Sequence, residues 1–334
     1  MSEEKTILVC GAGGFIGNHM VNRLIEDGHG VIGADINLPE YNETKAEDFF
    51  QWDLRDPENV ANIFDEYEFD EVYQFAADMG GAGYIFTGEH DADVMHNSAL
   101  VNLNIVRECV KNDVDRVFYS SSACIYPEHN QLDPNNPNCV EDSAYPANPD
   151  SEYGWEKLFS ERLYESFSRN YGLTTRICRY HNIFGPMGTW NGGREKAPAA
   201  MCRKVAEAEE GGQIEVWGPG DQTRSFLYID DCIQASIDLM ATDDDYYYGP
   251  TNIGSEEMVS INQLAQMAID ISGKDLTVWN NLENTALGVR GRNSENSQLL
   301  SSIGWKPTRP LKVGMINTYE WIEDQVVKSK GEEE

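Results

Sequence analysis

Short apolar runs alternate with helix signals along the first 180 residues of the chain. The runs have the length and composition of buried β-strands, and they cover residues 6–10, 30–35, 49–53, 71–75, 116–120 and 174–180. The helix signals extend from the end of the first run to about Asp27 and then cover 57–66, 91–111 and 151–171. This alternation predicts an α/β fold, a Rossmann-type doubly wound parallel sheet with helices on both faces.

The pattern changes after about His181. Glycine, proline and tryptophan become frequent, and the predicted elements are shorter and mixed in order. We therefore expect a dinucleotide-binding domain in residues 1–180 and a smaller, mixed α/β, substrate-binding domain formed mainly by residues 181–330. The polar end of the chain from Lys328 is predicted to be disordered, with residues 331–334 outside both domains.

Composition narrows the class of protein. The 334 residues include 57 acidic and 25 basic ones, a net charge of −32, so a nucleic-acid partner is not expected. This charge fits either a very soluble protein or one adapted to high intracellular salt, and the sequence leaves both open. No apolar run spans a membrane, the acidic N-terminus is unlike a signal peptide, and the seven cysteines lack a C-x-x-C pair. We expect a cytoplasmic protein with reduced thiols and no metal.

A glycine-rich turn follows the first predicted strand. Gly11, Gly14 and Gly17 are spaced as G-x-x-G-x-x-G between a strand and a helix. Such a turn lets the backbone approach a pyrophosphate, and the helix N-terminus supplies N–H donors. Asp35 ends the second strand, 18 residues past Gly17. A carboxylate there accepts from a ribose 2′-hydroxyl and repels a 2′-phosphate, which predicts NAD rather than NADP.

A second group of residues indicates hydride chemistry on an alcohol. Tyr153 and Lys157 are four residues apart, so they share one face of a helix. We expect the Lys157 ammonium to lower the pKa of Tyr153 and to hold the cofactor ribose, while Tyr153 takes the hydroxyl proton as hydride leaves. Ser122, at the end of a strand, is placed to hydrogen-bond the same oxygen. The predicted NAD site comprises Gly11, Gly14, Phe15, Ile16, Gly17, Asp35, Asp53, Leu54, Ala76, Tyr153 and Lys157. Within it, Asp53 could instead be a surface carboxylate.

These residues resemble a known superfamily. The glycine turn, Asp35, the Ser-Ser-Ala segment at 121–123 and the Tyr153/Lys157 pair are similar to the extended short-chain dehydrogenases/reductases, which modify nucleotide sugars. More specific segments closely resemble the GDP-mannose 3,5-epimerase family, and the likeness covers nearly the whole chain. They are residues 76–81, 121–127, 181–186, 192–200, 222–226 and 288–294. The chain departs from that family at Ala82-Gly83-Tyr84 and in its acidity.

The resemblance implies roles for a thiol and a second lysine. Cys124 and Lys196 match the base and the acid that exchange protons at sugar carbons, although a free cysteine is more often a small buried hydrophobe. The residues expected around the sugar nucleotide are Gly80, Ser122, Ala123, Cys124, Asn182, Glu195, Lys196, Ala197, Lys204, Trp217, Gln222, Thr223, Arg224 and Arg290. Arg224 and Arg290 suit a diphosphate or, alternatively, surface salt bridges. Trp217 lines the nucleotide pocket or belongs to the core.

The chemistry implied by these roles is consistent. Oxidation at C4 of a sugar acidifies the protons at C3 and C5, so a Cys124 thiolate can remove one and Lys196 can return one to the other face. The family implies GDP-mannose as substrate, GDP-L-galactose as product, GDP-L-gulose as the product of inversion at C5 alone, and a homodimer. The alternatives are a 4-epimerase or 4,6-dehydratase on the same scaffold, and a sugar-nucleotide-binding protein without catalysis. A 4-epimerase needs neither Cys124 nor Lys196.

Overall fold

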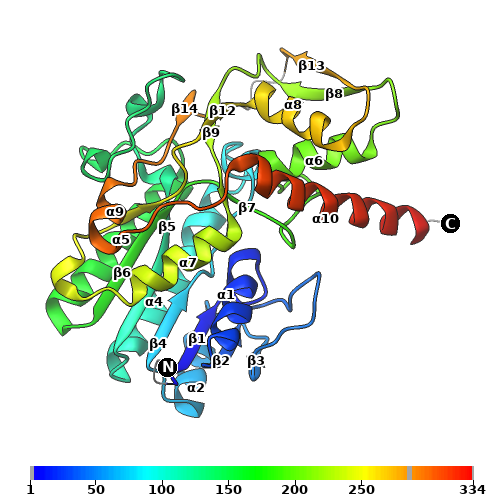
Figure 1. The fold of residues 1–334 in the computed structure, drawn as a ribbon. Coiled ribbons are helices and arrows are strands. Elements are labelled where there is room, and N and C mark those ends of the chain that lie inside the picture. The colour runs from blue at the N-terminus through cyan, green and yellow to red at the C-terminus, as the bar shows by residue number, and fades with distance from the viewer. Residues whose placement is uncertain (1–3, 284–287, 333–334) are drawn as a thin grey trace.

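A parallel sheet forms the centre of the molecule (Figure 1). The computed structural model describes residues 4–283 and 288–332, and the sheet has the strand order β11-β6-β5-β4-β1-β2-β3. Its neighbouring strands all run parallel, which confirms the predicted fold class. The strands are β1 (Thr6–Cys10), β2 (Gly30–Ala34), β3 (Asp48–Phe50), β4 (Glu71–Gln74), β5 (Arg116–Ser122), β6 (Thr174–Tyr180) and β11 (Thr251–Ile253).

Helices cover both faces of this sheet. Helices α1 (Phe15–Glu26) and α7 (Ile229–Met240) pack on one face, and α2 (Pro57–Glu66), α4 (Asp91–Lys111) and α5 (Glu152–Tyr171) pack on the other. Successive side chains of β1 alternate between the two layers: Ile7 and Val9 lie in one buried cluster, and Leu8 and Cys10 lie in the other. A strand buried on both faces is apolar throughout, and this is why β1 reads as an unbroken apolar run.

Capping residues set the ends of the helices that matter most for the site. Helix α2 begins with Asp56 as N-cap and Pro57 in its first turn, as predicted. Helix α5 begins where the Ser151 hydroxyl accepts from the N–H of Gly154, and it ends at Gly172, which has a φ of +78°. In contrast, β3 stops at Phe50 rather than at Asp53. The N–H of Trp52 turns back to the carbonyl of Phe50, which ends the ladder.

The second half of the chain forms a smaller lobe above the carboxyl edge of the sheet (Figure 1). Its strands are β7 (Ile183–Phe184), β8 (Gln213–Trp217), β9 (Thr223–Ser225), β10 (Leu227–Tyr228), β12 (Met258–Ser260), β13 (Thr277–Asn281) and β14 (Gly291–Arg292). Its helices are α6 (Ala197–Glu207), α8 (Ile261–Ser272), α9 (Ser297–Ile303) and α10 (Leu311–Glu332), while α3 (Ala82–Ile85) follows β4. Strand β8 pairs with β13, β7 pairs with β10, and β9 lies between β12 and β14.

Two features of the second half of the chain bear on the predicted domain limits. The division at residue 180 does not separate the layers, because α7 and β11 return to the main sheet, where β11 pairs with β6. The predicted disordered tail is helical through Glu332, since α10 packs on α6 and α8 and continues to its end. Lys328 and Lys330 suit the negative end of its dipole. Residues 333 and 334 of that prediction lie outside the described residues.

Two further properties bear on the class of protein. Within the described ranges, no helix combines the length and the apolar character needed to cross a bilayer. All seven cysteines belong to the described part of the chain, and each is a buried free thiol. The absence of disulfides among them agrees with the expectation of reduced thiols.

Candidate active site

The glycine turn lies where the chain order of the sheet reverses, between β1 and β4. Gly11 has a φ of +82°, and a Cβ on it would lie 2.7 Å from the backbone nitrogen of Ala76. A Cβ on Gly17 would lie 2.0 Å from the carbonyl oxygen of Gly11. Gly14 caps α1 without any side-chain hydrogen bond. The turn therefore presents bare backbone and the N-terminus of α1, which is the arrangement that binds a pyrophosphate at a topological switch point.

A cavity of about 820 Å³ opens in front of this turn. Six of the residues predicted for the cofactor line it: Gly14, Phe15, Asp35, Asp53, Leu54 and Ala76. Gly11 and Gly17 contribute close backbone packing, and Ile16 packs against the core of the sheet. The fold thus brings the predicted residues of the glycine turn, Asp35, Asp53, Leu54 and Ala76 together, whereas Ile16 packs on the core and Tyr153 and Lys157 lie outside the lining of this cavity.

Asp35 is held in place by the turn that it faces. Its carboxylate accepts from the N–H of Gly13 at 3.0 Å and from the N–H of Asn37 at 3.0 Å. Burial raises the pKa of Asp35, and these N–H groups oppose that rise. Asp53 differs, because it forms an exposed ion pair with Arg55 at 2.7 Å, which lowers the pKa of Asp53. Asp53 is thus a surface carboxylate that also borders the cavity, and its contact with the cofactor stays a prediction.

Tyr153 and Lys157 lie on the inner face of α5, and both are buried. The ammonium of Lys157 donates to the carbonyl of Ser120 at 2.9 Å and lies 5.7 Å from the centre of the Tyr153 ring. Burial lowers the pKa of Lys157. Burial also raises the pKa of Tyr153 well above its ordinary value, and a hydrogen bond with Ser122 opposes this rise. The expected net lowering of the Tyr153 pKa is therefore not seen, because desolvation of the phenol is the largest effect on it.

Cys124 lies in the 3-10 helix η1 (Ala123–Ile125), directly after β5. Ser122 caps this turn, since its hydroxyl accepts from the N–H of Cys124 at 3.2 Å. Cys124 belongs to a small buried cluster with Tyr153, Ile85 and Val94, so the thiol and the phenol line the same space. Cys124 is 8% exposed, whereas the other six cysteines are 0–1% exposed. It is therefore the most accessible of seven buried thiols.

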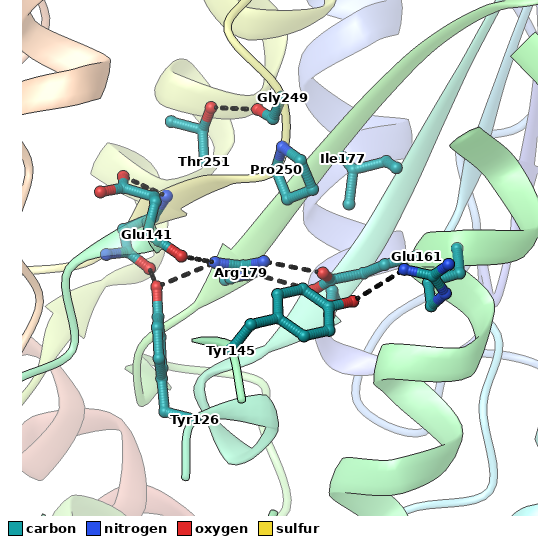
Figure 2. A network of polar contacts seen from close by, with 12 residues as sticks. Tyr126, Glu141, Tyr145, Glu161, Ile177, Arg179, Gly249, Pro250 and Thr251 are labelled. Atoms are coloured by element: carbon teal, nitrogen blue, oxygen red, sulfur yellow. Dashed lines mark hydrogen bonds and ion pairs between the residues drawn. The ribbon is translucent and has the colours of Figure 1, made fainter. Parts of the chain in front are cut away.

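A buried polar network holds the turn that carries Cys124 (Figure 2). Arg179 on β6 donates to both carboxylate oxygens of Glu161 on α5, at 3.0 and 2.9 Å, and to the hydroxyl of Tyr126 at 3.2 Å. Tyr126 ends η1 and donates to Asn252 on β11 at 2.6 Å. The hydroxyl of Ser121 donates to Glu161 at 2.5 Å. The end of β5 and the turn after it are thus fixed from two sides.

Lys196 is the N-cap residue of α6. Its side chain is exposed to solvent. Desolvation lowers the pKa of Lys196, and Cys124 opposes that change. The two residues predicted as acid and base are therefore electrostatically coupled. Glu195 is instead bound to Arg203 at 2.9 Å, which orients the start of α6.

Three of the predicted nucleotide-binding residues form a group in the smaller lobe. Lys204 on α6 lies 5.7 Å from the ring centre of Trp217 and donates to the carbonyl of Glu215 at 2.7 Å. Trp217 is 38% exposed, so it lies at the surface and not in the core. Gln222 is buried, and its side-chain oxygen has no hydrogen-bond partner within the described residues. An aromatic face beside an unused acceptor suits a purine base.

The two predicted arginines differ in their surroundings. Arg224 on β9 is largely buried and donates to the carbonyl of Thr223 at 2.8 Å and to that of Val289 at 2.6 Å. Burial and the neighbouring Arg292 lower the pKa of Arg224. Arg290 is more accessible and pairs with Asp221 at 2.7 Å, so the salt-bridge alternative holds for it in this structure. Gln222 directly precedes β9, and β9 carries Thr223 and Arg224, so this short segment links the group around Trp217 to the strand that pairs with Arg292.

The remaining predicted residues have structural contacts nearby. Asn182 has a φ of +50° and donates to the carbonyl of Ser225 at 2.9 Å, which ties β7 to β9. A Cβ on Gly80 would lie 2.7 Å from that of Tyr84, so the Gly-Gly segment packs under α3. Ala123 is buried within η1, and Ala197 opens α6 beside Lys196.

Several known proteins that are similar to this chain in sequence or in fold act on nucleotide sugars. The model of the NAD dependent epimerase/dehydratase family matches residues 7–254. The GDP-mannose 3,5-epimerase of Arabidopsis thaliana is 42% identical over 331 residues, which is 98% of this chain and 85% of that protein. The chain belongs to the NAD-dependent epimerase/dehydratase family.

Solved structures agree with this membership of the NAD-dependent epimerase/dehydratase family. The UDP-glucose 4-epimerase of Thermotoga maritima, solved with UDP-glucose, is 26% identical with a TM-score of 0.83, over 96% of this chain and 99% of that one. The UDP-glucuronic acid 4-epimerase of Bacillus cereus, solved with UDP-glucuronic acid and NAD, is 25% identical with a TM-score of 0.80, over 96% of this chain and 99% of that one.

The residues of this family member fit NAD, its cofactor. The fit rests on the cradle: added Cβ atoms at Gly11, Gly13 and Gly17 would lie between 1.9 and 2.7 Å from backbone atoms, so only glycine keeps this turn open. Asp35 keeps lone pairs toward the cavity, where a ribose hydroxyl would donate. Lys157 and Tyr153 would face the other end of the dinucleotide.

Sequence reasoning missed one residue that touches the thiol directly. Arg292 on β14 donates to Sγ of Cys124, with a distance of 3.2 Å from Nη1. The predicted neighbour of that sulfur was Lys196. Arg290 and Arg292 form an Arg-x-Arg pattern on one strand, which is visible in the sequence. Only the pairing of β14 with β9, which places Arg292 beside Arg224, decides which arginine faces the site.

Proposed function

We propose that the protein is a GDP-mannose 3,5-epimerase that converts GDP-α-D-mannose into GDP-β-L-galactose, with GDP-L-gulose formed by inversion at C5 alone. The observation that carries the proposal is the position of Cys124, which shares a buried cluster with Tyr153 and is coupled to Lys196. The contact between Cys124 and Tyr153 supports a thiol that acts beside the hydride residue, and the effect of Cys124 on the pKa of Lys196 supports Lys196 as its partner. The 42% identity to the Arabidopsis thaliana GDP-mannose 3,5-epimerase supports the substrate.

The first step generates acidity at carbon. When bound, NAD supplies the hydride acceptor for C4 and the hydride donor that restores it. Tyr153 acts as the phenolate: it takes the proton of the C4 hydroxyl and ends as the neutral phenol, while Ser122 hydrogen-bonds the same oxygen. Lys157, fixed on the carbonyl of Ser120, provides a positive charge beside the phenol. The resulting C4 ketone can delocalise the electron pair left when a proton departs from C5 or C3.

The second step inverts a carbon. The Cys124 thiolate takes the proton from C5, so an S–H bond forms and the C–H pair moves into the ketone as an enolate. The Lys196 ammonium then gives a proton to the other face of C5, and the ketone is restored. A lowered pKa makes this ammonium a better acid near neutral pH. Cys124 must lose its proton and Lys196 must regain one before C3 reacts, and the solvent-accessible Lys196 can exchange with water.

Two of the alternatives use only part of this site. A 4-epimerase on the same scaffold would need Tyr153 and Lys157, and the UDP-glucose 4-epimerase of Thermotoga maritima shares this fold. A non-catalytic nucleotide-sugar-binding protein would need none of the proton-transfer groups. The pair Cys124 and Lys196 favours the 3,5-epimerase over both, because neither needs a base and an acid at carbon. A 4,6-dehydratase also removes the C5 proton, so its product, which lacks the C6 hydroxyl, distinguishes it.

The test follows deuterium from solvent into the sugar. In D₂O the wild-type protein should place deuterium at C3 and C5 of GDP-mannose, measured by NMR. Cys124→Ala should abolish that uptake and keep bound NAD, because the variant lacks only the base. Tyr153→Phe should block uptake as well, since no ketone forms. Unchanged uptake in Cys124→Ala would refute the base assignment, and wild-type protein that never labels GDP-mannose would favour the alternatives.

Assembly and environment belong to the same proposal. We propose a homodimer built on α4 and α5, which pack side by side and expose Leu103, Trp155 and Phe159 to solvent. Trp155 and Phe159 are four residues apart, so they form one apolar patch on α5.

We also propose a cytoplasmic protein, which fits buried free thiols, and an adaptation to high salt, which fits the net charge of −32.

A further inference from the structure

Arg292 is a buried arginine whose three nitrogens all meet acceptors. Nη1 donates to Sγ of Cys124 at 3.2 Å, Nε donates to the side-chain oxygen of Gln131 at 2.6 Å, and Nη2 donates to Asp150 at 3.2 Å. The residue is 5% exposed, and the side chain of Asp150 is similarly buried. A buried guanidinium is tolerated only when its donors are satisfied, so each of these contacts is a structural requirement.

One of the three acceptors changes in strength with its protonation state. A neutral thiol is a weak acceptor, whereas a thiolate is an anion that receives a charge-assisted hydrogen bond. Gln131 and Asp150 satisfy the other two nitrogens with ordinary oxygen acceptors. The N–H group of Nη1 therefore makes a strong hydrogen bond only when Cys124 is ionised. The positive charge of Arg292 and the negative charge of a Cys124 thiolate would stabilise each other where both side chains are buried.

The strand that carries Arg292 is held firmly. In β14, Gly291 pairs with Thr223 of β9, and Arg292 pairs with Arg224. A Cβ on Gly291 would lie 2.7 Å from the carbonyl oxygen of Asp133, so the strand packs closely on the 133–134 segment. This segment follows the 3-10 helix η2 (Glu128–Gln131), which supplies Gln131. Strand pairing thus fixes the main chain of Arg292, and the contacts with Gln131 and Asp150 hold its guanidinium beside the sulfur.

Other charged and titratable groups also act on this sulfur, from several elements. Cys124 raises the pKa of Lys196 on α6, of Lys157 and Tyr153 on α5, and of the two arginines of β9 and β14. Asp150, ahead of α5, is the carboxylate that balances them through Arg292. The groups that face the thiol are Arg224, Arg292, Lys157, Lys196, Tyr153 and Asp150. Of the cations among them, Arg292 is the one with a hydrogen bond to Sγ in the described residues.

We propose that Arg292 holds Cys124 as a thiolate and aims its sulfur at the sugar ring. This inference deepens the proposed function and rests on its assignment of Cys124 as the base. During proton removal the S–H bond forms at Cys124, and Arg292 keeps all of its own protons because a guanidinium does not deprotonate in proteins. Arg292 is a fixed donor and not an acid. Lys196 thus remains free to act as the acid for the same carbon.

The experiment measures the reactivity of Cys124 as a function of pH, without any sugar nucleotide. The NAD-loaded protein is treated with iodoacetamide from mildly acidic to alkaline pH, and mass spectrometry follows alkylation of the peptide that contains Cys124. Only the thiolate reacts, so the profile reports ionisation. Arg292→Gln should move the midpoint upward by about one pH unit or more, which is about a tenfold loss of rate at neutral pH. Arg292→Lys, which keeps the charge, should move it less.

Two controls keep the result interpretable. Arg162→Lys changes an exposed arginine of α5 that contacts Tyr145, and it should leave the profile unchanged. Circular dichroism and retained NAD show whether each Arg292 variant folds, because loss of the cation leaves Asp150 buried without its ion pair. If neither variant folds, the wild-type protein still decides the matter. Its midpoint must lie below that of a short cysteine peptide treated in parallel.

The outcomes separate this inference from the function on which it rests. Superimposed profiles of wild type and a folded Arg292→Gln variant overturn the role of Arg292, whatever the substrate is. So does a wild-type midpoint equal to that of the peptide. A shifted profile in protein that never labels GDP-mannose in D₂O supports Arg292 and refutes the 3,5-epimerase. A purely structural arginine would lower stability without moving the midpoint.

Discussion

Single residues decide which chemistry this scaffold performs. In the proposed function, Tyr153 and Lys157 serve the transfer of hydride to and from an alcohol, and they lie on α5 as expected. Cys124, only two positions after Ser122, adds a group that can act on carbon. Its position beside the phenol matters, because the thiol can remove a proton only after the ketone has formed. The neighbouring Arg292 supplies the cation that the sequence could not assign.

Asp35 provides a test of cofactor choice at this scale. We expect Asp35→Asn to weaken NAD binding about tenfold, the loss of one charged hydrogen bond of about 1.5 kcal/mol, and to narrow the gap between NAD and NADP. Titration calorimetry with both dinucleotides measures the two affinities. Asp48→Asn, an exposed carboxylate of β3 that accepts from Tyr67, is the matched control. An unchanged ratio of affinities in Asp35→Asn would contradict the role of Asp35.

At the level of elements, a close contact between α5 and η1 aligns the site. A Cβ on Gly154 would lie 2.2 Å from the carbonyl oxygen of Cys124, so the glycine after Tyr153 lets the helix touch the turn. From the other side, Arg179 and Tyr126 hold the same turn (Figure 2). The phenol and the thiol are therefore placed by backbone packing as well as by their own side-chain contacts.

Gly154→Ala should separate these two elements. Because the added carbon meets a backbone carbonyl and not a flexible side chain, we expect overpacking that costs about 1–3 kcal/mol of folding free energy. The midpoint of thermal unfolding should fall by several degrees, and deuterium uptake at C5 should fall more than NAD binding. Gly331→Ala in α10, where an added carbon meets nothing within 4 Å, is the control. Wild-type stability and uptake in Gly154→Ala would show that the contact does not position the thiol.

The whole molecule places its site between two differently built parts. The parallel sheet supplies the dinucleotide cradle and α5, and the smaller lobe supplies Lys196, Lys204 and the paired strands β9 and β14 (Figure 1). Strand β11 and helix α7 return from the second half to the sheet, so the two parts share one hydrophobic core. The cationic groups at the site lie within a protein of net charge −32.

This charge predicts how stability depends on salt. Raising KCl from about 0.1 M to about 1 M shortens the Debye length from about 10 Å to about 3 Å, so repulsion among 57 acidic residues should weaken more than the exposed ion pairs do. We expect the midpoint of thermal unfolding to rise across this range. Sucrose of equal osmolality controls for solvent exclusion. A flat or falling midpoint would contradict the salt adaptation.

The proposed homodimer is tested on the same samples, because light scattering should give the mass of two chains.

The sequence by itself determined the parallel sheet, the cofactor turn and the Tyr153/Lys157 helix face. Those features depend on local rules: strand and helix periods, glycine at a tight turn, and a four-residue spacing. Its family likeness pointed to Cys124 and Lys196 as well. The sequence did not predict how far the last helix extends. Its polar last turns are helical because they continue a helix that is already packed at its start, and their own composition does not indicate a helix.

Only the tertiary structure decided which groups surround the sulfur. Arg292 is 168 residues from Cys124 along the chain, and no local pattern links them. Their contact depends on the pairing of β14 with β9 and on the packing of the 133–134 segment against Gly291. Likewise, only burial reveals that desolvation raises the pKa of Tyr153 against the effect expected of Lys157. Spacing along a chain specifies neighbours on one element, whereas dielectric and long-range contacts exist only after the elements pack.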